Sequence, residues 1–470
     1  MLFRRTLLYL PAQILAPTLQ FVLVLAWAHL LPSALVGTIA LATAIQEIAF
    51  AFFYTWWSQY LLRHLAGFRL AGGMARFLQA EAAAILGSSA AMLACATPVA
   101  ALYFADHIDR TTLALMAAFL LTRSLATYLA ERARADSQIG LYTIVQVGIP
   151  AGALALTVPA VDHWGPTAGA AFGPLIACQG AAIIACLLRM DMLRAGLRVH
   201  LDIGWQAARF GGPVMAGALL SALTLNAPRF IVDGLYGLEV AGAFAVPYGM
   251  GLRIASVAVM LVTAGAYPLA VSIYERDGAD AAYRQLASNF RMVLLVVLPV
   301  GIGAISVSPA LIEVLIPPGM RDTAHLALPL AVAFGTLRYL RSHTVDQVFL
   351  LNRRTRAVTA VTLLELALGS VLGLAGAADL GAPGAVLGPV AASAAALIVS
   401  WVLASRIRAF TSSAKDAAAI LAAAAPIPLI VLANPATGGL GSLVLATAVG
   451  AITYGAGILV LSRMNVLCFR

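Results

Sequence analysis

A chain of 470 residues that is 62% hydrophobic and only 10% charged is too apolar for an ordinary soluble protein, since such proteins are about 45–50% apolar and about 25% charged. The net charge of +9 does not indicate nucleic acid, because the basic residues stand in small groups between apolar runs, a pattern that orients helices in a membrane. The four cysteines form no C-x-x-C motif, and the only lysine, Lys415, follows no glycine-rich loop. We therefore expect no metal, no cofactor and no Walker-type ATP site.

The apolar runs, taken in chain order, predict an all-α polytopic membrane protein with about 14 transmembrane helices, at roughly 20 apolar residues per crossing. Glycine and proline turn signals separate many of the runs. We expect the first run to be an uncleaved helix rather than a signal peptide, because another long apolar run follows it almost at once. The predicted spans are 7–31, 35–61, 77–103, 112–131, 140–160, 167–188, 207–232, 240–273, 287–308, 324–350, 357–378, 383–404, 416–433 and 440–462.

The distribution of basic residues predicts the orientation of these helices. With the N-terminus in the cytoplasm, 22 of the 29 Lys and Arg residues lie at cytoplasmic helix ends and 2 lie in outer loops. Helical membrane proteins carry an excess of Lys and Arg on the cytoplasmic side. We therefore expect both termini in the cytoplasm and an even number of spans.

A short motif occurs twice in the chain. Residues 169–174 read GAAFGP and residues 384–389 read GAVLGP, and each copy opens an even-numbered predicted helix. In transporters built from such repeats, the substrate binds between the repeats. We expect an N-lobe of residues 1–200 with helices 1–6, a pseudo-symmetric C-lobe of residues 201–410 with helices 7–12, and a C-terminal helix pair in residues 411–470.

Eight charged residues stand out within the predicted spans. Charged side chains are costly in the bilayer and face a cavity or a partner rather than lipid. Arg338 and Arg341 are three positions apart and share one helix face, whereas Asp346, five positions beyond Arg341, is expected to point elsewhere. The set comprises the arginines Arg123, Arg229, Arg253, Arg338 and Arg341 and the carboxylates Glu47, Asp346 and Glu365.

The surplus of arginine over carboxylate in this set predicts a cationic cavity for an anionic substrate. Arginine binds phosphate through a planar, bidentate fork of N–H donors. We expect the five arginines to bind a phosphate or pyrophosphate group, and the three carboxylates to serve ion coupling or ion pairing. The alternative is structural ion pairing, for example between Glu47 and Arg253, that ties the lobes together.

Three aromatic residues, Trp56, Trp57 and Tyr60, end the second predicted span. Trp and Tyr are enriched where helices meet the membrane surface. We interpret these residues as part of an aromatic belt, and a sugar-binding platform is the alternative.

Several segments occur in an order that is typical of one transporter family. They include residues 226–233 (NAPRFIVD), 237–244 (GLEVAGAF), 337–342 (LRYLRS) and 353–356 (RRTR). This ordered set resembles the Wzx-type lipid-linked oligosaccharide flippases of the multidrug/oligosaccharidyl-lipid/polysaccharide exporter superfamily, and it covers most of the chain. Helices 13 and 14 exceed the twelve-helix minimum and resemble the extra pair that shelters the lipid tail in lipid II flippases.

The resemblance implies a flippase rather than an enzyme. Such a protein moves an undecaprenyl-pyrophosphate-linked oligosaccharide repeat unit from the cytoplasmic to the periplasmic leaflet of the bacterial inner membrane by alternating access. Its expected partners are the lipid-linked substrate, membrane lipids, and a polysaccharide polymerase with its chain-length machinery.

Three other functions compete with this one. An ion-coupled exporter of drugs or metabolites from the same superfamily would be expected to have an acidic cavity. The surplus of arginine within the predicted spans argues against this alternative. A major-facilitator transporter would carry a G-x-x-x-D-R-x-x-R/K loop, and the corresponding loop near Arg63 and Arg69 contains no Asp. A membrane glycosyltransferase would need a sizeable outer loop, and none is predicted.

Overall fold

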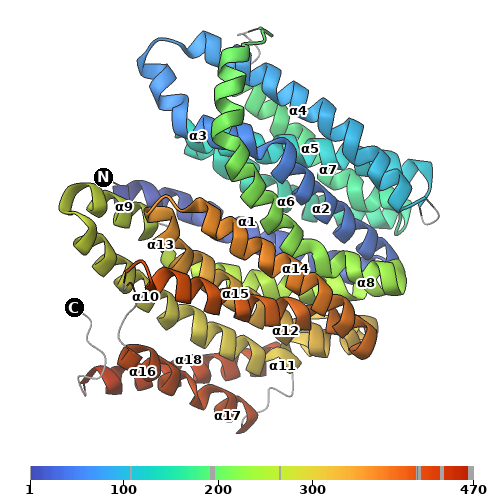
Figure 1. Cartoon of the computed structure of the whole chain (residues 1–470). Helices are drawn as coiled ribbons and strands as arrows, with labels where there is room; N and C mark the ends of the chain where they lie inside the picture. Colours follow the sequence, from blue (N-terminus) through green and yellow to red (C-terminus); the bar gives the residue numbers. More distant parts are fainter. Residues whose placement is uncertain are drawn as a thin grey trace. The chain divides into compact units, whose positions relative to one another are not determined.

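The computed structural model describes residues 2–105, 108–190, 196–263, 266–408, 410, 414–433 and 439–463 (Figure 1). Over these ranges the chain forms helices and no strand, as the all-α prediction requires. Ten of the described helices are long and apolar enough to cross a membrane. The chain is therefore a multi-pass helical membrane protein.

The predicted spans coincide with the observed helices, although some spans are broken in the middle. The second span, for example, divides at Tyr54 into α2 (Ser33–Phe53) and α3 (Thr55–Leu70). A continuous apolar run does not reveal such a break, because hydropathy reports burial and not the direction of the helix axis. The break matters because it changes where the aromatic residues of α3 point.

The chain divides into two compact units, unit 1 (Met1–Arg229) and unit 2 (Phe230–Arg470). The predicted lobes instead met near residue 200, because the prediction followed the internal repeat. The helix that begins at Leu201 packs within unit 1 over its first part, so compactness and sequence repeat divide the chain at different places. The division into repeat-based lobes stays a prediction.

Unit 1 is a bundle in which α6 packs on α1 and α7, and α5 packs on α7. Two side chains cap helix starts by accepting backbone N–H bonds: Asp109 from Thr112 at 3.1 Å and Thr167 from Ala170 at 3.3 Å. The hydrogen bonds from Thr112 also lower the pKa of the exposed Asp109. Besides α2 and α3, the unit contains α1 (Leu2–Leu30), α4 (Met74–Tyr103), α5 (Arg110–Ala135), α6 (Ile139–Trp164) and α7 (Ala168–Arg189).

The helix α8 (Leu201–Thr263) joins the seventh and eighth predicted spans in one stretch of 63 residues. The stretch breaks at Gly237, whose φ of 79° lies in the left-handed region. Glycine enters this region without the steric cost that a Cβ would impose. The predicted loop between the two spans is therefore reduced to a single sharp bend.

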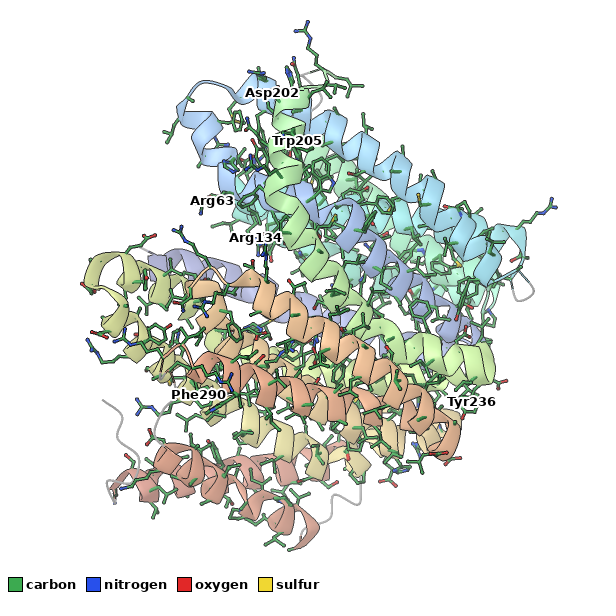
Figure 2. The ribbon with its side chains drawn as sticks, in the orientation of Figure 1. Arg63, Arg134, Asp202, Trp205, Tyr236 and Phe290 are labelled. Atoms are coloured by element: carbon green, nitrogen blue, oxygen red, sulfur yellow. The ribbon has the colours of Figure 1, made fainter. Side chains whose placement is uncertain are left out.

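The first part of α8 lies closely against α3 and α4. At its start Asp202, labelled in Figure 2, accepts a hydrogen bond of 2.8 Å from Arg76 of α4. Two turns further on, a Cβ at Gly211 would lie 2.0 Å from the backbone oxygen of Trp56. Only glycine permits this approach of the two helix backbones.

Unit 2 contains the second part of α8 and the remaining helices. Its three C-terminal helices form their own layer, in which α18 packs on α16 and α17, and both of those pack on α10. The bounds are α9 (Ala266–Asp277), α10 (Ala279–Ser306), α11 (Ser308–Leu315), η2 (Pro318–Met320), α12 (Arg321–Leu340), η3 (Arg341–Val345), α13 (Asp346–Leu351), α14 (Thr355–Leu380), η4 (Ala382–Val386), α15 (Leu387–Ser405), α16 (Ala414–Ala424), α17 (Pro426–Ala433) and α18 (Leu440–Arg463).

Glycines bring α14 into close contact with η4 and α15. A Cβ at Gly384 would lie 1.9 Å from the backbone oxygen of Gly376, and one at Gly388 would lie 2.0 Å from the backbone nitrogen of Gly373. Gly384 and Gly388 belong to the second copy of the repeated motif. The matching Gly173 of the first copy has open space beside it. The repeated motif therefore serves helix–helix contact in unit 2 but not in the same way in unit 1.

Candidate functional site

The charged residues predicted for unit 1 lie in what we call the amide cluster, which comprises Gln46, Glu47, Arg123, Asn226 and Arg229. Arg123 lies midway along α5, and its Nε donates a 2.8 Å hydrogen bond to Oε1 of Gln46 on α2. Its guanidinium also lies 5.6 Å from the ring centre of Phe119, within the range of a cation–π contact. Neutral groups thus make the direct contacts of Arg123.

Asn226 connects the two other predicted residues of unit 1. Its Nδ2 donates a 3.0 Å hydrogen bond to Glu47, and its Oδ1 accepts a 2.6 Å hydrogen bond from Arg229. An amide can serve both a carboxylate and a guanidinium because it carries a donor and an acceptor. The structure therefore brings Glu47 and Arg229 together through a neutral residue that the charge-based prediction did not include.

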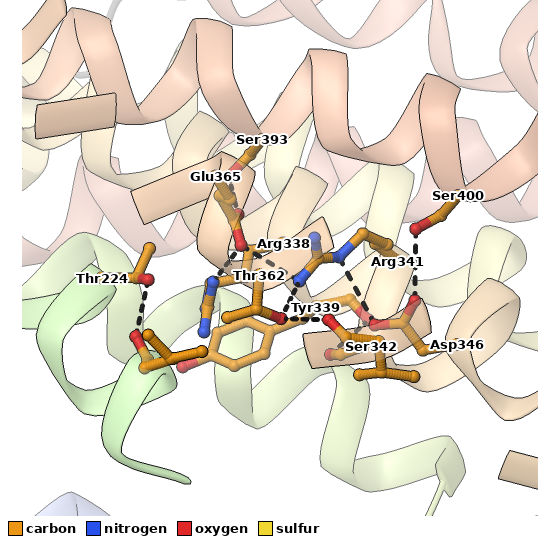
Figure 3. A network of polar contacts seen from close by, with 12 residues as sticks. Thr224, Arg338, Tyr339, Arg341, Ser342, Asp346, Thr362, Glu365, Ser393 and Ser400 are labelled. Carbon is orange, nitrogen blue, oxygen red and sulfur yellow. Dashed lines mark hydrogen bonds and ion pairs between the residues drawn. The ribbon is translucent and has the colours of Figure 1, made fainter. Parts of the chain in front are cut away.

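Four predicted residues of unit 2 form what we call the arginine–carboxylate cluster, Arg338, Arg341, Asp346 and Glu365 (Figure 3). Glu365 of α14 is at its centre. Arg338 donates to Oε2 of Glu365, and Nη2 of Arg341 lies 3.0 Å from the same oxygen. The hydroxyl of Ser393 on α15 donates to the other oxygen, Oε1. The cluster therefore links α12, η3, α14 and α15 through one carboxylate.

A π-helical turn, η3, aligns Arg341 with Asp346. On a regular α-helix two residues five positions apart point in different directions, and the sequence predicted this for the pair. A π-turn hydrogen-bonds each residue to the fifth along, and here it places Nε of Arg341 3.5 Å from Oδ2 of Asp346. The prediction that Asp346 points elsewhere was therefore wrong. Ser400 supports the carboxylate with a 3.3 Å hydrogen bond.

The cluster is buried and its formal charges balance. The exposed fractions are 5% for Arg338, 2% for Arg341, 3% for Asp346 and 0% for Glu365. Two arginines facing two carboxylates satisfy the requirement that buried charges be paired. These contacts give the carboxylates an ion-pairing role, whereas the predicted contact of Arg338 and Arg341 with substrate stays a prediction.

Arg253 lies on the second part of α8, and not on any of the helices that carry the arginine–carboxylate cluster. Its side chain is half-buried, and its backbone oxygen accepts a 3.0 Å hydrogen bond from Ser256. The predicted pairing of Arg253 with Glu47 would join the two units. Both this pairing and the predicted binding of substrate by Arg253 stay predictions.

A third buried cluster, which the sequence reasoning missed, connects α4 and α5. Glu81 is fully buried and accepts hydrogen bonds from Tyr128 and from Nε of Arg132, the latter at 2.8 Å. Asp136 extends the cluster by accepting from Arg132 and from Arg69. Arg132 directly follows the fourth predicted span and is one of the 22 basic residues at predicted cytoplasmic helix ends. Glu81 inside the third predicted span was the signal that should have identified its partner.

The aromatic-belt interpretation is wrong for Trp57 and Tyr60, which are 0% and 1% exposed. The break at Tyr54 directs α3 so that its aromatic side chains pack into unit 1. Trp57 donates a 3.1 Å hydrogen bond to Tyr128, and Tyr60 donates one of 3.2 Å to Gln206. Their polar atoms thus find protein partners, as buried Trp and Tyr require.

Unit 2 also contains a large apolar cavity of about 480 Å³. It lies within α8, α10, α11, α17 and α18, so the C-terminal helices supply one side of its wall. Aliphatic side chains and glycines dominate the wall, which includes Leu295, Val300, Gly303, Ile427, Gly450 and Tyr454. The volume is within the range of about 300–1,000 Å³ that is typical of ligand pockets.

Comparison with known proteins identifies the fold. No protein-family model and no curated protein sequence matches this chain. Among solved structures, a lipid II flippase MurJ in an inward closed conformation matches with a TM-score of 0.78 at 11% identity, covering 98% of this chain and 100% of its own. An inward-facing multidrug-resistance MATE transporter of the MOP superfamily matches with a TM-score of 0.64 at 12% identity, covering 83% and 95%. A Vibrio cholerae MATE transporter matches with a TM-score of 0.55 at 14% identity, covering 86% and 96%. The chain therefore has the polytopic fold of MOP-superfamily transporters.

Proposed function

We propose that this chain is a flippase for an undecaprenyl-pyrophosphate-linked oligosaccharide, which it moves from the cytoplasmic to the periplasmic leaflet of a bacterial inner membrane. The fold is that of a lipid II flippase over 98% of the chain. In this proposal both termini are cytoplasmic and the product supplies a polysaccharide polymerase with its chain-length machinery. The sugar sequence of the repeat unit lies outside the proposal.

The observation that carries the proposal is the apolar cavity of about 480 Å³ in unit 2. A polyprenyl tail already lies in an apolar solvent, so its entry into the cavity brings little hydrophobic gain, and binding depends on van der Waals packing instead. The small and aliphatic side chains of the cavity wall provide such packing. The α17 and α18 helices that supply part of the wall belong to the predicted pair beyond helix 12.

The cationic residues have the chemistry to bind the head group of such a substrate. Guanidiniums bind pyrophosphate oxygens through two parallel N–H bonds. In our proposal Arg229 and Arg253 bind the head group, and Arg123 contributes its positive charge. For Arg338 and Arg341, an arriving pyrophosphate competes with Glu365 and Asp346, so that substrate binding and ion pairing alternate at this cluster.

In the proposed cycle the two repeat-based halves rock about a central substrate site while the tail stays in lipid. The carboxylates Glu47, Asp346 and Glu365 then couple the movement to an ion or hold the resting state by ion pairing. In this proposal the bend of α8 at Gly237, where the helix direction changes, serves as the hinge of the movement.

The test fills the apolar cavity and measures flipping. Gly450 lines the cavity, and a Cβ there would make only ordinary contact with Ile427, at 3.6 Å. In proteoliposomes, Gly450→Leu should lower several-fold the rate of translocation of a fluorescent polyprenyl-pyrophosphate-linked oligosaccharide. Its insertion into the membrane should not change. Gly441→Leu is the matched control, because Gly441 lies exposed on the same helix.

Two outcomes would count against the proposal in different ways. If the unaltered protein translocates no lipid-linked oligosaccharide above the rate of empty vesicles, the chain is not a flippase. If both glycine variants keep the normal rate, flipping does not use the apolar cavity.

The principal rival is an ion-coupled exporter of drugs or small metabolites. Its sites would be expected to present unpaired carboxylates to a cationic substrate. In the described part of unit 2, Asp346 and Glu365 instead face arginines. Export of a cationic dye by proteoliposomes in a sodium or proton gradient would favour the rival.

A further inference from the structure

A small polar cavity lies inside unit 1, at the level where Arg123 sits midway along α5. Its volume is about 80 Å³, and its wall comes from α1, α5, α6 and α7. Three glutamines, Gln20, Gln146 and Gln179, line it together with Arg123 and Thr127. The polar groups around this space call for a partner or a ligand, because each buried polar group costs free energy unless it has a partner.

The hydrogen bonds around the cavity show which groups are available to a ligand. Oε1 of the buried Gln179 accepts a 2.7 Å bond from Thr122, and this leaves the amide N–H groups of Gln179 as donors. Nε of Arg123 is used by Gln46, which leaves the two terminal nitrogens of the guanidinium. The hydroxyl proton of Thr127 is directed to the backbone oxygen of Arg123 at 2.8 Å. The strongest available groups are therefore donors.

The charge of the wall also favours a negative ligand. Within the described part of unit 1, the lining residues include one guanidinium and no carboxylate. The carboxylate of Glu47, which is not part of the wall, attracts Arg123 electrostatically but accepts a hydrogen bond from Asn226. A cation at mid-membrane depth is stabilised by a counter-charge close to it, since the surrounding dielectric is low.

The size of the cavity limits the class of ligand. A single water needs roughly 10–15 Å³ of such space, so a cavity of about 80 Å³ holds a few water-sized particles. Drug-sized ligands occupy pockets of about 300–1,000 Å³. A pyrophosphate carrying a sugar does not fit, whereas a halide with one or two waters does.

We propose that this cavity is a binding site for a small inorganic anion of the size of chloride. The terminal nitrogens of Arg123 and the amide N–H groups of Gln179 hold the anion, and Gln20 and Gln146 complete the wall. The ion neutralises Arg123 and ties α5 to α7. The site is distinct from the tail site of the proposed flippase but shares Arg123 with the proposed head-group site, and its existence does not depend on flipping.

The experiment measures anion-dependent stability of the purified full-length chain at constant ionic strength and constant sodium. Chloride replaces gluconate, an organic anion too large for the cavity. Because a ligand that binds only the folded state stabilises it by mass action, Tm should rise with chloride concentration and then level off. Binding of radioactive chloride should saturate near one ion per chain.

Two variants test the location of the site. Arg123→Gln removes the charge and should abolish both the Tm response and chloride binding. Ala126 lines the cavity, so Ala126→Leu places a larger side chain in the cavity without changing any charge. This variant should weaken chloride binding at least ten-fold. Ala114→Leu is the matched control, since Ala114 lies exposed on the same helix, and should bind chloride normally.

Equal Tm values in chloride and gluconate, with no saturable chloride binding, would show that the cavity holds only water and would overturn the proposal. Chloride binding that survives both Arg123→Gln and Ala126→Leu would place the ion elsewhere and would overturn it equally. Because no flipping is measured, these outcomes are independent of the test of flippase activity.

Discussion

Two clusters, the amide cluster of unit 1 and the arginine–carboxylate cluster of unit 2, hold arginine within the predicted spans in different ways. In unit 1, Arg123 contacts the amide of Gln46 and the ring of Phe119, and Glu47 is reached through Asn226 rather than directly. In unit 2, Arg338 and Arg341 contact the carboxylate of Glu365 directly. The amide cluster thus surrounds the guanidinium of Arg123 with neutral groups, whereas the arginine–carboxylate cluster, like the pair of Arg132 with Glu81 in unit 1, closes guanidiniums against carboxylates.

The difference teaches that a buried arginine is not by itself a sign of substrate binding. A direct ion pair satisfies the charge locally and is costly to break, because removal of one partner leaves an uncompensated charge in a low dielectric. Neutral amides satisfy the hydrogen bonds of a guanidinium but not its charge. Arg123 of the amide cluster therefore keeps its attraction for an anion, whereas a ligand of the arginine–carboxylate cluster must first displace a carboxylate.

The largest expected effect follows from removal of Glu365, the carboxylate that Arg338 and Arg341 share. Glu365→Leu should destabilise the protein by about 3–5 kcal/mol, the usual cost of breaking a buried ion pair. Thermal unfolding in detergent, measured by loss of soluble folded protein, checks this value. The double variant Arg338→Met/Glu365→Leu should recover a large part of the loss, since an apolar replacement of the whole pair leaves no unpaired charge.

The matched variant in unit 1 sharpens the comparison. Glu47→Leu leaves the contacts of Arg123 with Gln46 and Phe119 in place, and its cost should be smaller than that of Glu365→Leu. Equal losses for the two variants would break the distinction between the two ways of burying arginine.

A smaller effect is expected for a hydroxyl that donates to the shared carboxylate. Ser393 is fully buried and bonds Oε1 of Glu365. Because hydrogen bonds to charged groups contribute about 1.5–3 kcal/mol, Ser393→Ala should lower the stability by that amount. A loss close to zero in the same unfolding assay would show that water replaces the hydroxyl and that the cluster is less dry than its burial indicates.

The smallest effect is expected for the corresponding hydroxyl in unit 1. Thr122 donates a 2.7 Å bond to the neutral amide of Gln179. Thr122→Val removes this bond at nearly constant shape, and a neutral hydrogen bond contributes about 0.5–1.5 kcal/mol. Unfolding curves of the Thr122 and Ser393 variants, measured side by side, should therefore differ in midpoint. A Thr122 variant that is the less stable of the two would reverse the expected order.

Much of the fold was predictable because it depends on local composition. Long apolar runs find their lowest free energy as helices in the bilayer, where each backbone group must be bonded within its own segment. The runs therefore gave the spans, and the sharp break at Gly237 fell between two of them. The break at Tyr54 was not predictable, because the apolar run continues through it and the cause lies in the packing of α3 against neighbours far away in the chain.

The candidate sites were predictable only in part, for a related reason. A charge within an apolar span is visible in the sequence, and the eight predicted charged residues were found in this way. Their partners were less visible. Gln46, Asn226 and Gln179 are neutral, so no charge marks them as partners, although Asn226 belongs to the segment 226–233. Asp346 reaches Arg341 only because a π-turn changes the helix register.

The sequence by itself determined that the chain is a multi-pass helical membrane protein, where its spans lie and which spans contain charges, since these properties depend on the free energy of transferring each segment into lipid. Only the tertiary structure decided which of those charges are paired. The partners of Glu365 come from α12, η3 and α15, and the walls of the two cavities from four or more helices each. Contacts between side chains on different helices depend on how each helix is rotated about its axis and where that axis bends. No local property of the sequence specifies these contacts.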